Sequence, residues 1–177
     1  MCELILSAFK RPCATPSGIT SIIISDVYAN GVAGLSFAVT SGVATITGTG
    51  GVAYRIKQDD FVSTLTQAIT ADKASNAFMY ELSLELKLDG TSAAIGVLVQ
   101  ELVKGRVVAF AVYTNGDIKA LGIQRGGSVT GGDAGASGTG MGDAKGATLT
   151  LTESSTIPAP NILLATIAGA FTITEPA

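Results

Sequence analysis

The stretch from Gly105 to Thr130 constrains the fold of this chain more than any other part of it. Two apolar runs flank Asn115-Gly116, and this arrangement is the strongest short-range signal of a β-hairpin. Both turn residues tolerate a positive φ, so we expect a two-residue type I′ turn that matches the twist of the flanking strands.

The expected turn length also fixes which residues of the hairpin face each other. The pairs predicted from it are Tyr113 with Ile118, Ala111 with Ala120, and Phe110 with Leu121. One face then carries Val108, Phe110, Val112, Leu121 and Ile123, and the other carries the mostly smaller Ala109, Ala111, Tyr113, Ile118, Ala120 and Gly122. Because neither face is polar, we expect both to be covered, by the rest of the fold or by a neighbouring subunit.

Further strands are indicated by alternating or β-branched segments, which are Ile19–Tyr28, Leu35–Val39, Val43–Thr47, Ala53–Lys57, Phe61–Thr70, Phe78–Leu88 and Ala147–Thr152. The cleanest of them is Phe78–Leu88, where four leucines alternate with polar residues at a strict period of two. Its leucines are Leu82, Leu84, Leu86 and Leu88, and its polar residues are Glu81, Ser83, Glu85 and Lys87. One side of this strand should face the core and the other should face water or a partner.

One segment has the spacing of a helix, at about residues 92–104. Its apolar stripe consists of Ala94, Ile95, Leu98, Val99, Leu102 and Val103. Lys104 in the last turn and Gly105 after it are typical of a helix C-terminus. We expect this helix to pack across the sheet formed by the long strands on either side of it.

The remaining segments predict the domain plan. Residues 1–18 are interpreted as an N-terminal arm, either a loose terminus or a grip on a neighbour, and residues 19–160 as one β domain. Gly126–Gly146 is predicted to be a flexible loop at a subunit contact, and Glu153–Pro160 to be a proline-marked loop. Residues 161–177 form a C-terminal extension, in which Ile162–Thr166 and Phe171–Thr174 are two short strands or a tail laid on a neighbour.

The composition narrows the possible functions. Charged residues make up only 14% of the chain, which suggests that copies of the chain cover much of its surface. The net charge of −3 argues against a basic face that binds nucleic acid. It is compatible with a weakly acidic channel through which DNA slides, because like charge denies the phosphates a gain from counterion release.

No arrangement typical of an enzyme is found, so we expect no catalysis and no cofactor. The chain has no histidine, which removes the usual general base and most zinc sites. Cys2 and Cys13 lack metal-ligand spacing and are either two buried or capping thiols or a local disulfide. The glycine-rich segment fits neither phosphate-binding template, and the remaining acidic candidates, Asp59, Asp60, Asp133 and Asp143, are scattered.

Two kinds of targeting segment are not indicated by the sequence. Met1-Cys2-Glu3 lacks the basic start and long apolar core of a signal peptide, and no run of 18 apolar residues occurs. We therefore expect synthesis in the cytoplasm and no membrane partner.

The order of several motifs resembles the tail tube proteins of bacteriophages, particularly those of phages with Bacteroidetes-type hosts. The early motif is Lys10-Arg11-Pro12 between Cys2 and Cys13, and the match is densest from Tyr80 to Pro160. The later motifs are the leucine-rich strand Tyr80–Leu88, then Leu98, Leu102 and Gly105–Val108, Asn115–Asp117, Leu121-Gly122, Gly127–Gly132, Ser137-Gly138, Met141–Asp143, Gly146–Thr152 and Pro158–Pro160. The segment after Asn161 is longer than the resemblance suggests.

The resemblance implies a β-sandwich or partial barrel with one flanking helix. Six copies would form a ring, and stacked rings would give a β-lined channel for DNA in a virion tail. Its partners would be copies of itself, other tail proteins at the tube ends, and DNA or a tape-measure protein in the lumen. Residues that we expect at contacts between subunits are Gly126, Gly127, Thr130, Gly132, Asp133, Ser137, Met141 and Asp143, and the expected lumen residues are Glu81, Ser83, Glu85 and Lys87.

Two other functions stay open at this point. A contractile injection system uses an inner tube of the same architecture, so the tube could belong to such a device. The chain could also be a β-sandwich decoration or binding module on a virion or cell surface. Sugar-binding modules usually display exposed aromatic residues, whereas this sequence has no tryptophan and only 6% aromatic residues.

Overall fold

The computed structural model describes residues 18–25, 35–58, 63–72, 77–89, 93–136 and 146–175. Within these residues the chain is mainly β, with two antiparallel-rich sheets and two helices, which confirms the expected fold class. Residues 1–17 of the expected arm, with Cys2 and Cys13, lie outside the described residues, as do Asp59, Asp60, Ser137, Met141 and Asp143.

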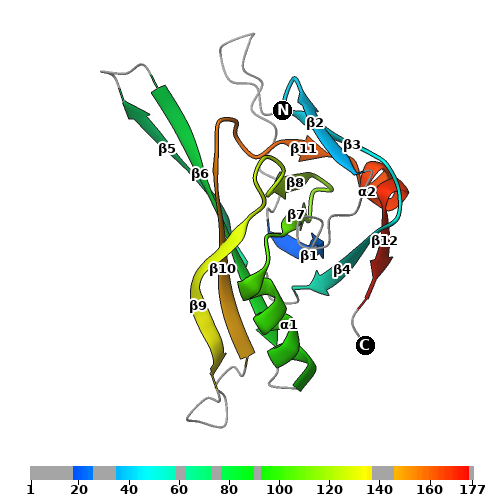
Figure 1. The fold of residues 1–177 in the computed structure, drawn as a ribbon, viewed down its shortest axis with the longest axis vertical. Coiled ribbons are helices and arrows are strands. Elements are labelled where there is room, and N and C mark those ends of the chain that lie inside the picture. The colour runs from blue at the N-terminus through cyan, green and yellow to red at the C-terminus, as the bar shows by residue number, and fades with distance from the viewer. Residues whose placement is uncertain are drawn as a thin grey trace, which may run out of the picture.

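The larger sheet has eight strands and curls on itself (Figure 1). In spatial order its strands are β12 (Phe171–Thr174), β4 (Gly51–Lys57), β1 (Ile19–Ser25), β7 (Val108–Tyr113), β8 (Ile118–Leu121), β11 (Asn161–Ile162), β3 (Val43–Thr47) and β2 (Ser36–Thr40). The short helix α2 (Leu164–Ala170) packs against both β3 and β12, which lie near opposite ends of the strand order. The curled sheet and α2 therefore make a partial barrel.

The smaller sheet has four strands in the order β5 (Leu65–Asp72), β6 (Ala77–Asp89), β10 (Gly146–Ser155) and β9 (Ser128–Ala136). All three neighbouring pairs are antiparallel. Helix α1 (Ala93–Lys104) lies beside the lower half of this sheet, next to β9, on the side that faces the partial barrel (Figure 1). The predicted helix is thus confirmed, although its stripe is narrower than expected, because Val99 and Leu102 are buried while Val103 is 54% exposed.

Two apolar cores hold the fold together. The first lies between the sheets and contains the four leucines of β6, together with Leu149 and Leu151 of β10 and Val99 and Leu102 of α1. The second lies inside the curl, where Phe110, Ile167 and Phe171 meet Ile23 and Ile118. The strict alternation in β6 and β10 correctly predicted the first core, because each leucine of these rows is less than 5% exposed.

The hairpin formed by β7 and β8 has a different register from the predicted one. Ala111 faces Lys119 and Phe110 faces Ala120, one residue away from the expected pairs. The reason is a three-residue loop: the Gly116 N–H donates to the Tyr113 carbonyl, the Tyr113 N–H donates to the Asp117 carbonyl, and only Gly116 takes a positive φ. This is a type I turn followed by a glycine bulge, which replaces the expected type I′ turn.

The one-residue shift changes the predicted faces. Leu121 joins Ala109 and Ala111 in the core between the sheets, while Ile118 and Ala120 join Phe110 inside the curl. The expectation that both faces are covered is confirmed, since Val108 to Ala111 are each at most 1% exposed within the single chain.

Three predictions of local structure are corrected. Residues 128–136 of the expected glycine-rich loop form strand β9, and Glu153–Ser155 of the expected proline-marked loop continue strand β10. The strand predicted at Ile162–Thr166 ends at Ile162, because α2 begins at Leu164 and buries Ile167 and Ala170, three residues apart, on one helix face. The expected C-terminal extension, residues 161–177, contributes β11, α2 and β12 to the curled sheet and its core.

Candidate assembly surface

One face of the four-stranded sheet is apolar and buried, and the opposite face, here called the outer face, is polar. Strand register places on the outer face the side chains of Thr66, Glu81, Ser83, Glu85, Lys87, Thr130, Asp133, Thr148, Thr150, Thr152 and Ser154. Hydroxyl groups dominate it, no aromatic side chain is among these residues, and the same register adds the exposed Met79 near the start of β6. The four predicted lumen residues therefore lie together in one row, with a row of threonines beside them.

Neighbouring strands on the outer face are linked through their short side chains. The Thr152 hydroxyl donates to the Thr130 hydroxyl at 3.3 Å, which joins β10 to β9. The Thr66 hydroxyl donates to the Ser83 carbonyl at 3.4 Å, which joins β5 to β6. Hydroxyl groups on the outer face therefore link β10 to β9 and β5 to β6.

The charges on the outer face are mostly negative. Glu81, Glu85 and Asp133 carry three negative charges and Lys87 carries one positive charge, so these described residues sum to −2 per chain. Glu81 and Glu85 are exposed, and the Thr64 hydroxyl donates to a Glu85 carboxylate oxygen at 3.5 Å. Such a face repels a polyanion weakly and offers it no cluster of cations.

The two edges of this sheet are long and open. Strands β5 and β9, of eight and nine residues, form its borders, and among the described residues neither has a second neighbouring strand. The borders of the curled sheet, β12 and β2, have only four and five residues. Since long unpaired borders are the ones that recruit another chain, the four-stranded sheet is the candidate surface for assembly.

The two open edges are offset along the strand direction. Leu65, at the start of β5, pairs with Leu84 of β6, which in turn pairs with Leu151 of β10. From this level β5 runs toward the end of the sheet where β10 finishes (upward in Figure 1). Ser128, at the start of β9, pairs with Thr152, and β9 runs downward to the level of Gly146. The midpoints of the two edge strands therefore differ by five to six residues, roughly 18 Å at 3.3 Å per residue.

Strand β9 contains three of the residues predicted at subunit contacts, namely Thr130, Gly132 and Asp133, and all three are exposed. Two register shifts interrupt its pairing with β10. Gly132 has a φ of +140°, and a Cβ there would collide with the Thr148 carbonyl oxygen, whereas a Cβ at Gly131 would meet nothing within 4 Å. The bulges bend the strand, and the glycine at 132 is required by the backbone.

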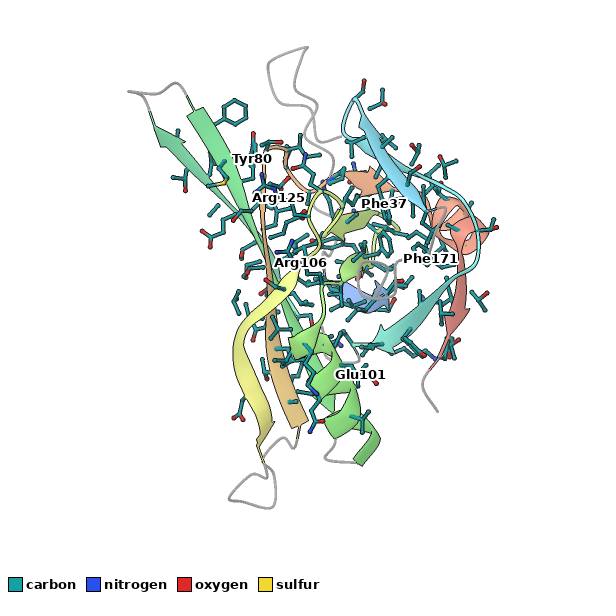
Figure 2. The ribbon with its side chains drawn as sticks, viewed as in Figure 1. Phe37, Tyr80, Glu101, Arg106, Arg125 and Phe171 are labelled. Atoms are coloured by element: carbon teal, nitrogen blue, oxygen red, sulfur yellow. The ribbon has the colours of Figure 1, made fainter. Side chains whose placement is uncertain are left out.

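Gly126 and Gly127, also predicted at subunit contacts, are buried within the chain. Gly127 exchanges backbone hydrogen bonds with Val107 at 2.8 and 2.9 Å, and the Gly126 N–H donates to the Gly122 carbonyl at 3.0 Å. We leave these two residues out of the candidate surface. The loop that contains them is tied further by Arg106, which donates to the Arg125 carbonyl at 2.9 Å (Figure 2).

Glu153 of β10, which was not predicted from the sequence as a functional residue, organises the loop between β8 and β9. Glu153 is 5% exposed, and its carboxylate accepts hydrogen bonds from the backbone N–H groups of Gly122 at 2.6 Å, Gln124 at 3.1 Å and Arg125 at 3.4 Å. A signal for this role was present in the sequence of β10. Alternation that buries Leu149 and Leu151 also buries the residue two positions later, which is the carboxylate Glu153.

Other kinds of site find no support in the described part of the chain. It contains no group of three or more His, Cys, Asp or Glu side chains that could hold a metal ion. No helix in the described segments is long and apolar enough to cross a membrane. The comparison with known proteins adds no family: no family model matches this sequence, and no curated protein or solved structure matches it.

Proposed function

We propose that this protein is a structural tube subunit whose four-stranded sheets join edge to edge in a closed ring, with the outer face lining a channel. The observation that carries the proposal is the sheet itself: one face buried in the chain's own core, the other hydroxyl-rich, and both long borders open. The resemblance to phage tail tube proteins supplies the assignment to a virion tail and to six copies per ring.

The strand directions support edge-to-edge joining. The four strands alternate in direction, so β5 and β9 are antiparallel to each other. When a copy is rotated about an axis along the tube, its β9 arrives beside β5 of the first copy in the antiparallel sense. Every copy then uses the same two edges, which is the heterologous contact that closes a ring.

The offset between the edges supports a barrel of ordinary geometry. For β9 of the next copy to align with β5, that copy must be shifted by roughly 18 Å along the strands. The distance across the strands from one copy to the next is four strand spacings, about 19 Å. These values give a strand tilt of about 43°, close to the 35–45° found in closed barrels. The tilt follows from the register within one chain and does not depend on the number of copies.

Six copies of the four-stranded sheet would give 24 strands. With this tilt the circumference would be about 160 Å and the backbone diameter about 50 Å. Barrels of about 16–18 strands already leave an aqueous channel, so a channel of this width can pass a nucleic acid. The weakly negative outer face then favours passage without adhesion.

Electron microscopy of the purified protein tests this proposal. We expect rings or tubes with a central channel as the protein concentration rises. A single monomeric species at every concentration and salt would contradict it and would favour the decoration module instead.

A second measurement tests which face lines the channel. Changing Glu81 and Glu85 to Lys alters the summed charge of the outer face from −2 to +2 per chain, and we expect assembled tubes of this variant to retain DNA in a salt-dependent manner. The matched control changes Asp117 and Glu175 to Lys, which adds the same charge to the curled sheet. Equal DNA retention by both variants would show that the outer face does not line the channel.

A further inference from the structure

The end of the four-stranded sheet projects beyond the body of the chain. Strands β5 and β6 continue past the point where the other strands stop and stand apart from the rest of the ribbon at the upper left of Figure 1. We call residues 68–72 and 77–80 the arm, which is distinct from the N-terminal arm expected at residues 1–18. Strand β10 ends opposite Tyr80, so residues 70–72 and 77–79 lie beyond it. Next to it along β5, the Ala159 N–H donates to the Gln67 side-chain oxygen at 3.1 Å, which ties β5 to the body.

The side of the arm that faces the body is apolar and uncovered. It continues the same row that contains the buried leucines of β6, in which exposure rises from 0–4% at Leu82 to Leu88 to 60% at Phe78. Ile69, which pairs with Tyr80, is 66% exposed. Figure 2 shows Tyr80 at the base of the arm, on the body side of β6, and its ring meets Phe78 edge to face at 6.1 Å.

This apolar row points to a partner because its pattern matches a core strand rather than a solvent-exposed one. Exposed strand ends usually carry polar or charged residues on both faces. Here the body-facing side of the arm displays Ile69, Phe78 and Tyr80 in one cluster, held in place by a two-stranded ladder from Leu65 to Asp72.

The occupant follows from the proposed ring, on which this inference rests. When β9 of the next copy aligns with β5, the middle of β5 near Ile69 lies level with the middle of that β9. In each copy, α1 packs against β9 on the body side of the sheet. The α1 helix of the next copy therefore lies next to the body-facing side of the arm. Its Val97 and Val103 are 55% and 54% exposed in the single chain.

We infer that the arm docks on a second copy of this chain, with Ile69, Phe78 and Tyr80 packed against the α1–β9 region of the neighbour. This contact extends the buried core of one chain into the next on the body side of the barrel wall. It gives the ring an apolar contact in addition to the backbone hydrogen bonds between β5 and β9.

Photo-crosslinking from the arm tests the inference with little change to the side chain. The photoreactive residue p-benzoylphenylalanine replaces Phe78, and labelled and unlabelled chains are mixed so that crosslinks between chains are distinguished by mass. We expect crosslinks between chains to peptides of α1 or β9. The matched control carries the same residue at Leu163, which is 67% exposed at the start of α2 and should not crosslink to α1 or β9.

Substitutions measure how much the contact contributes. Ile69→Asp and Phe78→Asp should each leave the melting temperature of the monomer unchanged, because both side chains are more than half exposed in it. Each should raise the protein concentration needed for assembly by at least about tenfold. Leu163→Asp, at a similarly exposed apolar residue, should leave that concentration unchanged.

The possible outcomes separate this inference from the proposed function. Rings whose Phe78 crosslinks fall within one chain, or on the curled sheet of another, would overturn the inference and leave the ring standing. Crosslinks to α1 or β9 in an open filament would support the inference and overturn the closed ring. A monomer with no crosslinks between chains at any concentration would overturn both.

Discussion

The two sheets of this protein differ in how completely the chain covers them. The curled sheet closes around its own core, with α2 bridging β3 and β12, so that Phe110 is fully buried and Ile167 with it. The four-stranded sheet is covered on one face only, and its arm leaves Ile69 and Phe78 more than half exposed. The curled sheet is therefore completed within the chain, while the four-stranded sheet shares one core with it and presents a face and edges that a neighbour can complete.

The largest expected effect contrasts apolar truncation in the two sheets. Phe110 lies inside the curl with its ring centre 5.9 Å from that of Phe171, so Phe110→Ala should lower the free energy of unfolding by about 3–5 kcal/mol. Ile69→Ala on the arm should change the stability of the monomer by less than about 0.5 kcal/mol. Urea denaturation of the monomer measures both values.

The two outcomes that would break this contrast are distinct. A large loss of stability for Ile69→Ala in the monomer would mean that the chain itself covers the arm. A small loss for Phe110→Ala would mean that the core inside the curl is loosely packed and that the partial barrel is not the rigid half of the molecule.

A smaller effect is expected from the backbone of the open edge. Gly132→Ala places a Cβ against the Thr148 carbonyl oxygen at a φ of +140°, and it should cost about 2–3 kcal/mol and release β9 from β10. Gly131→Ala, whose Cβ would meet nothing within 4 Å, is the control and should cost less than about 1 kcal/mol. Hydrogen exchange of the β9 amides and urea denaturation report the two effects separately, and equal protection in both variants would show that the bulge does not hold the edge.

Much of the fold could be predicted because most of its strands have an alternating or β-branched sequence pattern of their own. The leucines of β6 and β10 alternate without interruption, and the helix at 93–104 has both a stripe and a glycine after its end. The strands predicted at Leu35–Val39 and Val43–Thr47 are found as β2 and β3, and the turn between them has two residues, Ser41 and Gly42, which both take a positive φ. At Asn115-Gly116, by contrast, the Asn115 side chain accepts from the Asp117 N–H at 3.0 Å, and the loop has three residues.

The rest could not be predicted from the sequence, for physical reasons that differ between residues. Strand β9 contains three glycines in nine residues, so its pairing depends on β10 and not on its own propensity. Helix α2 is only seven residues long and too short to be stable alone, so its contacts with β3 and β12 decide its structure. Alternation along β6 was enough to predict that Glu81, Ser83, Glu85 and Lys87 share one polar face. The offset of β5 from β9 along the strands depends on how all four strands pair, which one strand's sequence does not contain.

A further contrast separates the two faces of the four-stranded sheet. Glu153 lies in the inward row and accepts three backbone N–H groups, so Glu153→Gln should lower the free energy of unfolding by about 1–2 kcal/mol through the loss of charge-assisted hydrogen bonds. Glu85→Gln, in the exposed outer row, should change it by less than about 0.5 kcal/mol. Urea denaturation of the two variants compares them directly, and equal losses would mean that the loop from Gly122 to Arg125 does not depend on the buried carboxylate.

The smallest expected effect is on the pH dependence of stability and concerns Tyr113, a partly buried residue that packs against the core between the two sheets. Burial raises the pKa of the Tyr113 phenol above its ordinary value of 10.0, so the native state keeps this proton at a pH where the unfolded chain has lost it. The resulting contribution to stability is fully present below about pH 10 and is lost as the pH rises through the native pKa. Tyr113→Phe removes the phenol, so its melting temperature should fall less steeply than that of the unmodified protein between about pH 9 and about pH 11. Every other side chain is the same in both proteins, so the difference between the two curves isolates Tyr113. Parallel curves would show that water reaches the Tyr113 hydroxyl freely and that the layer between the sheets is wetter at this end than the core inside the curl.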